Sequence, residues 1–296
     1  MKRVAAVVVT YNRKQLLREN IECLLAQSSK DCLDVLIIDN ASTDNTREYI
    51  SEFIDEGKVK YYNTGANLGG AGGFHYGIKL AAENEYDYVW IMDDDCMPTE
   101  TALSELLRAD EKLGGNYGFL SSKTLWCDND ICKMNIQRRT LTKKVNDFSS
   151  ESVPIVMASF VSLFIPVGVI KEVGLPIKEF FIWSDDLEYT RRISYKYKCY
   201  LCNLSVVIHK SDANNGSNIA VDSIERLERY KLSYRNEVYI FRREGIVGFF
   251  YQTLRLFLHI FRILFKSKDN KSKRIKCVLE GTKNGFSFKP EIEYVG

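Results

Sequence analysis

The chain has 296 residues, which is enough for one large domain with an appendage or for two modest domains. Its 41 Lys and Arg residues nearly balance its 39 Asp and Glu residues, so the formal net charge is only +2. This balance excludes a protein whose whole surface attracts polyanions, and we expect no nucleic-acid partner.

Strands and helices alternate along the first ninety residues. Residues 4–9 are a Val-rich apolar run, which is typical of a strand buried on both faces. The elements expected next are a helix through Leu25, a strand at 35–38, a helix to Ile54, a strand at 59–62, a helix through Ala82 and a strand at 88–92. This order predicts an α/β fold with a doubly wound sheet, right-handed crossovers and helices on both faces.

Polar clusters follow these strands, at the sheet edge where ligands bind in such folds. They are Thr10-Tyr11-Asn12-Arg13, Asp39-Asn40, the stretch from Asn67 through Gly69 and Gly70 to Gly73, and Asp93-Asp94-Asp95. Two carboxylates one residue apart suit Mg²⁺ or Mn²⁺, which bridges a diphosphate. The glycines favour close approach of the backbone to a ligand, and N–H groups at a helix start suit an anion. A solvated acidic turn and a tight turn without a ligand remain the alternatives.

Residues 114–155 are less regular and include a basic stretch, so we interpret them as a variable insertion or an acceptor-facing segment. A helix is predicted to open at Ser184, with acids in its first turn. Aromatic residues before these acids suggest a sugar platform with a base at its edge. The alternative is that acids simply favour a helix N-terminus and that Glu188 pairs with Arg192 at i,i+4.

His209 closes the apolar strand LSVVIHKSD. A lone histidine is more often structural, but this one follows an acidic cluster in a chain with only three histidines. A metal-ligand role and a structural role therefore both stay open.

The cysteines and the N-terminus bear on the cellular compartment. The segment MKRVAAVVVTYNR lacks the apolar run of a secretory signal, so we expect reduced thiols in a cytoplasmic protein. Cys127 and Cys132 with Cys199 and Cys202 leave a four-thiolate zinc site as an alternative. Residues three apart on a strand point to opposite faces, which weighs against it.

The ordered motifs VVVTYNR, IIDNASTDNT, NLGGAGGF, DDD and DDLE resemble the inverting glycosyltransferases of family 2, which have the GT-A fold with a mixed sheet. The resemblance covers residues 3–210. Within this family, the motifs resemble those of bacterial galactofuranosyltransferases most closely. Rhamnosyltransferases are the next most similar group. The resemblance implies a metal-dependent hexosyltransferase that moves galactofuranose from UDP-galactofuranose to a hydroxyl of a growing, lipid-linked cell-surface glycan.

The resemblance also implies roles for individual residues. The residues expected to bind the donor are Thr10, Tyr11, Asn12, Arg13, Asp39, Asn40, Asn67, Gly69, Gly70, Asp93 and Asp94. The residues expected to lie around Mn²⁺ or Mg²⁺ are Asp93, Asp95 and His209. Asp186 is the expected general base, and Trp183, Asp185 and Glu188 are expected to contact the acceptor. In the family pattern the tryptophan directly precedes the two aspartates, whereas Ser184 intervenes here.

We expect a catalytic domain over residues 1–215, in which 1–113 bind the nucleotide-sugar and 114–215 bind the acceptor. A helical C-terminal region follows over 216–296. Its stretch 246–265 is long enough to span a membrane, yet a polar stripe runs along it at Gln252, Arg255, His259, Arg262 and Lys266. Such a helix favours the bilayer interface.

Six basic residues adjoin this helix: Lys266, Lys268, Lys271, Lys273, Arg274 and Lys276. They would attract anionic lipid, which predicts peripheral attachment of residues 246–276 at the inner face of the cell membrane. The alternative is a helix packed on the catalytic domain or on a second subunit, so a homo-oligomer stays open.

Three rival functions remain. One is rhamnosyl transfer from dTDP-rhamnose. Another is a nucleotidyltransferase, although that class places a glycine-rich loop after strand one and TYNRKQLL has no glycine. The last is a catalytically silent nucleotide-sugar-binding subunit of a polysaccharide assembly complex.

Overall fold

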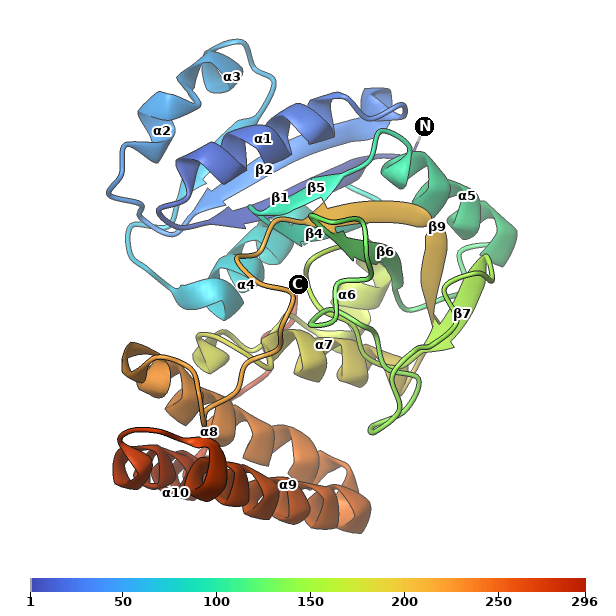
Figure 1. Ribbon diagram of the computed structural model, residues 1–296. Helices are drawn as coiled ribbons and strands as arrows, with labels where there is room; N and C mark the ends of the chain where they lie inside the picture. The colour runs from blue at the N-terminus through green and yellow to red at the C-terminus, as the bar shows by residue number, and fades with distance from the viewer. Residues whose placement is uncertain (1) are drawn as a thin grey trace.

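The computed structural model describes residues 2–296 and contains one mixed sheet of nine strands (Figure 1). The strand order is β3-β2-β1-β4-β8-β6-β9-β5, and β7 pairs with β9. The strands are β1 (Val4–Thr10), β2 (Leu33–Asp39), β3 (Lys60–Asn63), β4 (Tyr88–Asp93), β5 (Cys96–Pro98), β6 (Leu120–Trp126), β7 (Ser152–Ile155), β8 (Leu163–Pro166) and β9 (Cys199–His209). Strands β1 to β4 are parallel, and β8 is antiparallel to β4. The predicted mixed sheet is therefore confirmed.

Helices cover both faces of this sheet (Figure 1). They are α1 (Lys14–Leu25), α2 (Thr46–Tyr49), α3 (Ser51–Asp55), α4 (Gly69–Ala82), α5 (Ala102–Leu113), α6 (Val167–Val173) and α7 (Asp185–Ser194), with short 3₁₀ turns η1 (Lys30–Cys32) and η2 (Lys178–Phe180). The predicted alternation over residues 4–92 is confirmed, except that the helix ending near Ile54 is two short helices that meet at Ile50.

Two hydrophobic cores lie on the two faces of the sheet. Alternate residues of β1 belong to different cores, because successive side chains of a strand point to opposite faces. Ala5, Val7 and Val9 pack with α4, α6 and α7. Val4, Ala6 and Val8 pack with α1, α3 and α5. This two-sided burial explains the unbroken apolar run of β1.

Strand β6 corrects the prediction that residues 114–155 are a variable insertion. It lies inside the sheet between β8 and β9. Its sequence lacks an apolar pattern because Ser121 and Ser122 are buried there. The Ser122 hydroxyl lies 2.8 Å from Ser162 Oγ, just before β8, and 2.7 Å from Ser205 Oγ on β9, so the three buried serines satisfy one another.

Glycines let helix α4 lie close to the sheet. A Cβ at Gly73 would lie 2.6 Å from Val9 Cγ1, and a Cβ at Gly77 would clash with Val7 and lie 2.8 Å from Ile38 Cγ1. These two glycines therefore serve helix–sheet packing.

Gly77→Ala is expected to lower the free energy of unfolding by about 1–3 kcal/mol, because the added methyl group overpacks the interface. Chemical denaturation followed by circular dichroism measures this loss. Gly168→Ala in α6 is the matched control, since a Cβ there meets nothing within 4 Å. Equal stability of the two variants would contradict the packing role.

The C-terminal residues form a helical unit beside the sheet domain (Figure 1). It consists of η3 (Ile224–Arg226), α8 (Leu227–Arg243), α9 (Gly245–Lys266) and α10 (Lys271–Ser287). The final residues return to the sheet domain, where Val295 joins a core and Glu293 Oε1 lies 2.7 Å from Lys79 Nζ. The expected helical appendage is present, and the boundary at 215/216 stays a prediction.

The polar stripe of α9 points toward α8 along its first half. Gln252 is buried, Arg255 Nη2 donates to Glu237 Oε1 over 2.8 Å, and His259 Nδ1 lies 2.8 Å from the Tyr234 hydroxyl. The apolar side chains point outward instead, at Ile246, Val247, Phe249, Phe250, Leu254, Phe257, Leu258, Phe261, Leu264 and Phe265. By length and composition alone, α9 is the one described helix that passes as a candidate membrane span, with 17% of its apolar window buried.

Candidate active site

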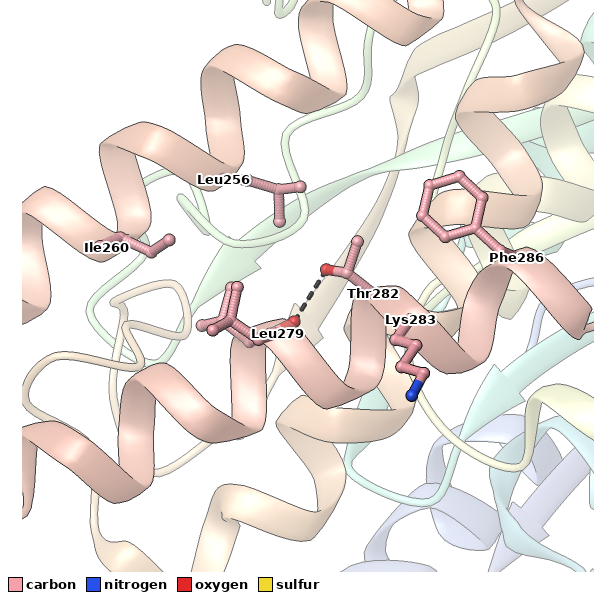
Figure 2. Close-up of a pocket in the computed structure, with 7 residues that line it drawn as sticks. Leu256, Ile260, Leu279, Thr282, Lys283 and Phe286 are labelled. Carbon is pink, nitrogen blue, oxygen red and sulfur yellow. Dashed lines mark hydrogen bonds between the residues drawn. The ribbon is translucent and has the colours of Figure 1, made fainter.

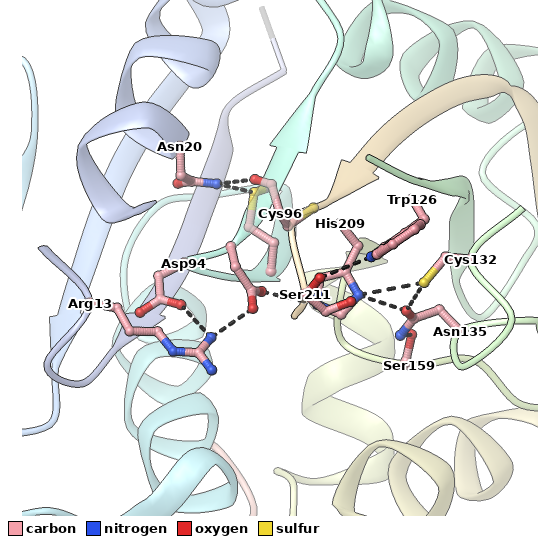
Figure 3. Close-up of polar contacts among 12 residues, drawn as sticks. Arg13, Asn20, Asp94, Cys96, Trp126, Cys132, Asn135, Ser159, His209 and Ser211 are labelled. Carbon is pink, nitrogen blue, oxygen red and sulfur yellow. Dashed lines mark hydrogen bonds and ion pairs between the residues drawn. The ribbon is translucent and has the colours of Figure 1, made fainter. Parts of the chain in front are cut away.

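A chain of polar contacts runs across the carboxyl ends of the central strands. Thr10 Oγ1, at the end of β1, donates to Asp94 Oδ2 over 2.7 Å. Arg13 Nη1 donates to Asp95 Oδ2 over 2.6 Å and lies 3.4 Å from Asp94 Oδ1 (Figure 3). The Asp93-Asp94-Asp95 turn joins β4 to β5. The structure therefore brings the first and fourth polar clusters together, as the parallel sheet predicts.

His209 reaches the same cluster because of strand pairing. The antiparallel register of β5 and β9 places Cys96 opposite His209. His209 Nε2 consequently lies 3.1 Å from Asp95 Oδ1. Its other ring nitrogen, Nδ1, lies 2.8 Å from Asn135 Oδ1 (Figure 3).

The carboxylates of this cluster differ in their pKa values. Burial raises the pKa of Asp94 to about 6, although Arg13 opposes the rise. Burial and the charge of Asp95 raise the pKa of Asp93. Burial acts in the same direction on Asp95, but its contacts with His209 and Arg13 lower its pKa overall. Burial alone would lower the pKa of His209, and the carboxylate of Asp95 instead raises it to about 10.

Asp95 and His209 fit a hard divalent cation in two respects. Asp95 Oδ1 is buried and accepts no hydrogen bond in the described structure, despite its short distance to His209. Asn135 Nδ2 donates to Ser159 Oγ over 2.9 Å, which turns its Oδ1 toward His209 Nδ1 as an acceptor. A bound cation would displace the proton from Nε2, and with Nδ1 protonated that nitrogen would offer its lone pair to the cation.

A protein-only metal cage is not formed. Within residues 2–296, no three His, Cys, Asp or Glu side chains gather as a metal-holding group, so the four-cysteine zinc alternative is wrong for the described chain. Mg²⁺ usually takes one or two carboxylates together with substrate phosphates. The residues present therefore fit a cation shared with a diphosphate, and cation binding stays a prediction.

The other expected donor residues surround this cluster but already have partners. Asp39 is buried, and it accepts hydrogen bonds from the Tyr61 hydroxyl and, over 2.8 Å, from the Ser42 amide. Asn12 Oδ1 accepts from the Thr43 amide over 2.7 Å. Asn40 Nδ2 donates to Gly69 O over 3.0 Å. Tyr11 is 42% exposed, which leaves its ring open to a ligand.

The start of α4 differs from the expected open anion site. Asn67 Oδ1 accepts from the Gly69 amide over 2.9 Å, and the Phe181 carbonyl accepts from the Ala71 amide over 3.1 Å. A Cβ at Gly69 would clash with the Phe181 carbonyl, whereas one at Gly70 would meet open space. The backbone at Gly69 therefore approaches another part of the chain, the Phe181 carbonyl, rather than a ligand. Contacts of Asn67, Gly69 and Gly70 with the donor stay predictions.

Helix α7 places two adjacent carboxyl groups near the β4–β5 turn. Burial and the charges of Asp186 and Asp93 raise the pKa of Asp185 well above its usual range. Burial raises the pKa of Asp186 to about 6, opposed by the Leu187 amide and by Arg138. The charge of Asp93 is one of the causes of the raised pKa of Asp185, so the two acidic motifs are close enough to interact.

Glu188 and Trp183 have other partners than those expected. Glu188 forms a two-point ion pair with Arg192, with both N–O distances 2.9 Å, so its carboxylate supports the helix rather than an acceptor. The Trp183 ring packs edge-on against Tyr230 at 4.9 Å between centroids. Ser184 precedes α7 as predicted, but its side chain forms no cap hydrogen bond. Phe181, 40% exposed, is the aromatic side chain of this loop that faces solvent.

Sequence reasoning missed Asn135, Arg138 and Asn236. Asn135 orients His209, Arg138 acts on the pKa of Asp186, and Asn236 contacts the loop before α7. The first two lie in the segment read as variable, where no strand pattern pointed to the site. Nothing in a single sequence distinguishes these residues from ordinary polar side chains.

Comparison with known sequences identifies relatives. Residues 5–121 match the family described as "Glycosyl transferase family 2". Galactofuranosyltransferase GlfT1 of Mycolicibacterium smegmatis is 28% identical over 202 residues, covering 64% of this chain and 65% of that protein. GlfT1 of Mycobacterium tuberculosis is 28% identical over 200 residues, covering 64% of each. The match thus spans slightly less than two thirds of these relatives.

Comparison with solved structures supports the fold. S. aureus TarS 1-349 superposes with a TM-score of 0.56 at 14% identity, covering 97% of this chain and 72% of that one. GalNAc-T7 with UDP, GalNAc and Mn²⁺ superposes with a TM-score of 0.61 at 14% identity, covering 80% and 47%. Residues 5–121 are therefore similar to glycosyltransferase family 2, and the chain has the GT-A fold of these structural neighbours.

Proposed function

We propose that the protein is an inverting, metal-dependent glycosyltransferase that moves galactofuranose from UDP-galactofuranose to a hydroxyl of a growing, lipid-linked glycan. The observation that carries the reaction class is the cluster of Asp94, Asp95 and His209 with Thr10 and Arg13 at the carboxyl ends of the central strands. The names of the GlfT1 relatives support the donor. The titles of TarS with UDP and with UDP-GlcNAc support a uridine nucleotide.

Asp186 is the base in this mechanism. Burial raises the pKa of Asp186 to about 6, which is still below neutral pH, so its carboxylate is available to accept a proton. As the acceptor oxygen forms its bond to the anomeric carbon, its proton passes to Asp186. The bond from that carbon to the diphosphate oxygen breaks with its electrons on the leaving oxygen. Attack from the opposite face inverts the configuration.

Asp95 and His209 would hold Mn²⁺ or Mg²⁺ next to the diphosphate, and the expected contribution of Asp93 stays a prediction. The bound cation would supply positive charge that balances the charge of the leaving group. Arg13 is the protein's own cation in this cluster, and it neutralises Asp95 and Asp94 in the described structure. Thr10 fixes Asp94 through its hydroxyl.

A lipid-linked acceptor agrees with the outward face of α9. Phe257 and Phe265 on this face are 68% and 72% exposed. An exposed apolar face of this size marks a lipid or protein contact, and its aromatic, leucine-rich composition suits the bilayer interface. A groove of about 230 Å³ between α9 and α10 adds apolar surface; Figure 2 shows Leu256, Ile260, Leu279, Thr282, Lys283 and Phe286 lining it.

The basic segment supports attachment to an anionic membrane surface, with one change. Lys266, Lys268, Lys271, Lys273 and Lys276 are exposed. Arg274 is buried and donates to the Ile219 and Asp222 carbonyls, so the prediction that its side chain attracts anionic lipid is wrong. We therefore propose that the protein sits at the cytoplasmic face of the membrane. A relative 29% identical over 110 residues, from Campylobacter jejuni, carries an undecaprenol-linked substrate in its name.

Phe257→Asp is expected to weaken binding to phosphatidylglycerol vesicles by about tenfold or more, because burying a Phe side chain contributes about 1.5–3 kcal/mol. Co-sedimentation with the vesicles measures the binding. Leu204→Asp is the control, since Leu204 is 46% exposed on β9, away from the helical unit. Equal binding of both variants and the wild type would exclude α9 as the lipid contact.

A donor screen tests the proposed function. Release of nucleoside diphosphate is followed with UDP-galactofuranose, other UDP-sugars and dTDP-rhamnose, each with a lipid-linked glycan acceptor. Turnover of UDP-galactofuranose supports the proposal, and turnover of dTDP-rhamnose would replace it by rhamnosyl transfer. Binding of UDP without turnover of any donor would indicate the silent-subunit alternative.

A further inference from the structure

The loop that leads into α7 has an unusual backbone. Phe181, Trp183 and Ser184 all have positive φ angles, of 62°, 64° and 68°. Residues with a Cβ adopt this region at a cost of about 1–2 kcal/mol each. Three such residues within four positions persist only if surrounding groups hold them, and this loop ends directly at Asp185 and Asp186.

Asn236 on α8 holds this loop from within the core, while the adjacent Arg235 donates from its Nη2 to Glu179 O over 2.6 Å and to Phe180 O over 3.3 Å. Asn236 is fully buried, and its amide nitrogen Nδ2 lies 2.9 Å from Trp183 O, 3.0 Å from Phe180 O and 3.3 Å from Ile182 O. Its Oδ1 accepts from Arg235 Nη2 over 2.9 Å. The guanidinium only donates, so it fixes which end of the amide faces the loop.

The loop connects Asn236 to both parts of the site. Its Phe181 carbonyl accepts the hydrogen bond from Ala71 at the start of α4, and its last residue precedes the catalytic pair. A second contact holds α7 to the same helical unit, since Arg191 Nη2 donates to Glu244 Oε2 over 2.9 Å. Asn236 is thus the buried polar link between the C-terminal helices and the acidic motif.

We propose that Asn236 is a positioning residue, which holds the loop 180–184 so that Asp186 meets the acceptor hydroxyl. This inference rests on the proposed function for its catalytic part. Asn236 touches no reacting atom. Its amide satisfies the loop carbonyls, which keeps the backbone in the strained form from which α7 begins.

The test variant is Asn236→Leu, which removes the side-chain amide with little change of volume. The matched control is Val238→Ala, which weakens the packing of the same helix where Val238 contacts Gly285. Asn236→Leu is expected to lower kcat about 100-fold, as a misplacement of about 1 Å does, with the KM for donor little changed. Val238→Ala is expected to keep a kcat near that of the wild type. Equal kcat values for the two variants would overturn the proposal.

Asn236→Asp covers the case in which the leucine variant fails to fold. It keeps the side-chain shape and places an accepting oxygen opposite the loop carbonyls, so the same loss of kcat is expected, whereas a wild-type kcat would overturn the proposal.

Hydrogen–deuterium exchange separates this inference from the proposed function. In full-length protein without substrate, exchange at Ala71 and across 181–187 is expected to accelerate in Asn236→Leu but not in Val238→Ala. Unchanged exchange would overturn the positioning role. If the wild type turned over no donor, the proposed function would fail, and the exchange result would still decide whether Asn236 holds the loop.

Discussion

Asp186→Asn is expected to lower kcat for sugar transfer by about 10²–10⁴-fold, because a positioned general base contributes that much. An amide does not take up the acceptor's proton, yet it keeps the size of the carboxylate. Donor binding is expected to remain, since Asp186 lies outside the Thr10–Asp94–Arg13 contacts. Steady-state kinetics and titration with UDP measure the two quantities.

Asp185→Asn is the matched control for this variant. Burial and its neighbours raise the pKa of Asp185 and so disfavour its charged form. An uncharged amide resembles the neutral form more than the charged one, so a much smaller loss is expected. A large loss in Asp185→Asn with near-normal rates in Asp186→Asn would move the base to Asp185. The wild-type kcat/KM should also fall as the pH drops through about 6, where Asp186 gains a proton.

Asp95→Asn is expected to weaken Mn²⁺ binding in the presence of UDP by at least about tenfold, because it removes one carboxylate oxygen from a ligand set completed by phosphates. Electron paramagnetic resonance of free Mn²⁺ measures the affinity without turnover. Chelation of the divalent cation is expected to lower transfer by the wild type by about 10²–10³-fold, the loss typical of removing one charge-stabilising group.

Asp212→Asn is the control for this loss of charge. Asp212 is exposed and lies three residues beyond His209 in the chain, so it tests whether general electrostatics explains the effect. The proposed cation site would be excluded if the Asp95 and Asp212 variants bound Mn²⁺ with equal affinity. Full turnover by the wild type in excess chelator would also exclude it.

Local patterns in the sequence were sufficient for the first half of the fold. The apolar runs of β1, β2 and β4 and the acids after β4 predicted a parallel sheet with a ligand edge, and the structure has both. These features depend on residues a few positions apart, because strand burial and helix periodicity are set by neighbours along the chain. The period of α9 was likewise readable, and it is a single amphipathic helix.

Contacts between distant segments required the tertiary structure. Asp95 meets His209 only through the β5–β9 register, and β6 was missed because its buried serines have partners in other segments of the chain. The inward direction of the α9 polar stripe and the contacts of Asn236 with the loop before α7 belong to the same class.

The sequence by itself therefore determined the first strands of the sheet and the chemical groups at its edge, because near-neighbour periodicity encodes strand burial. The tertiary structure alone decided which of these groups face one another and which are already satisfied, because strand register and helix packing bring together side chains that are far apart in the chain.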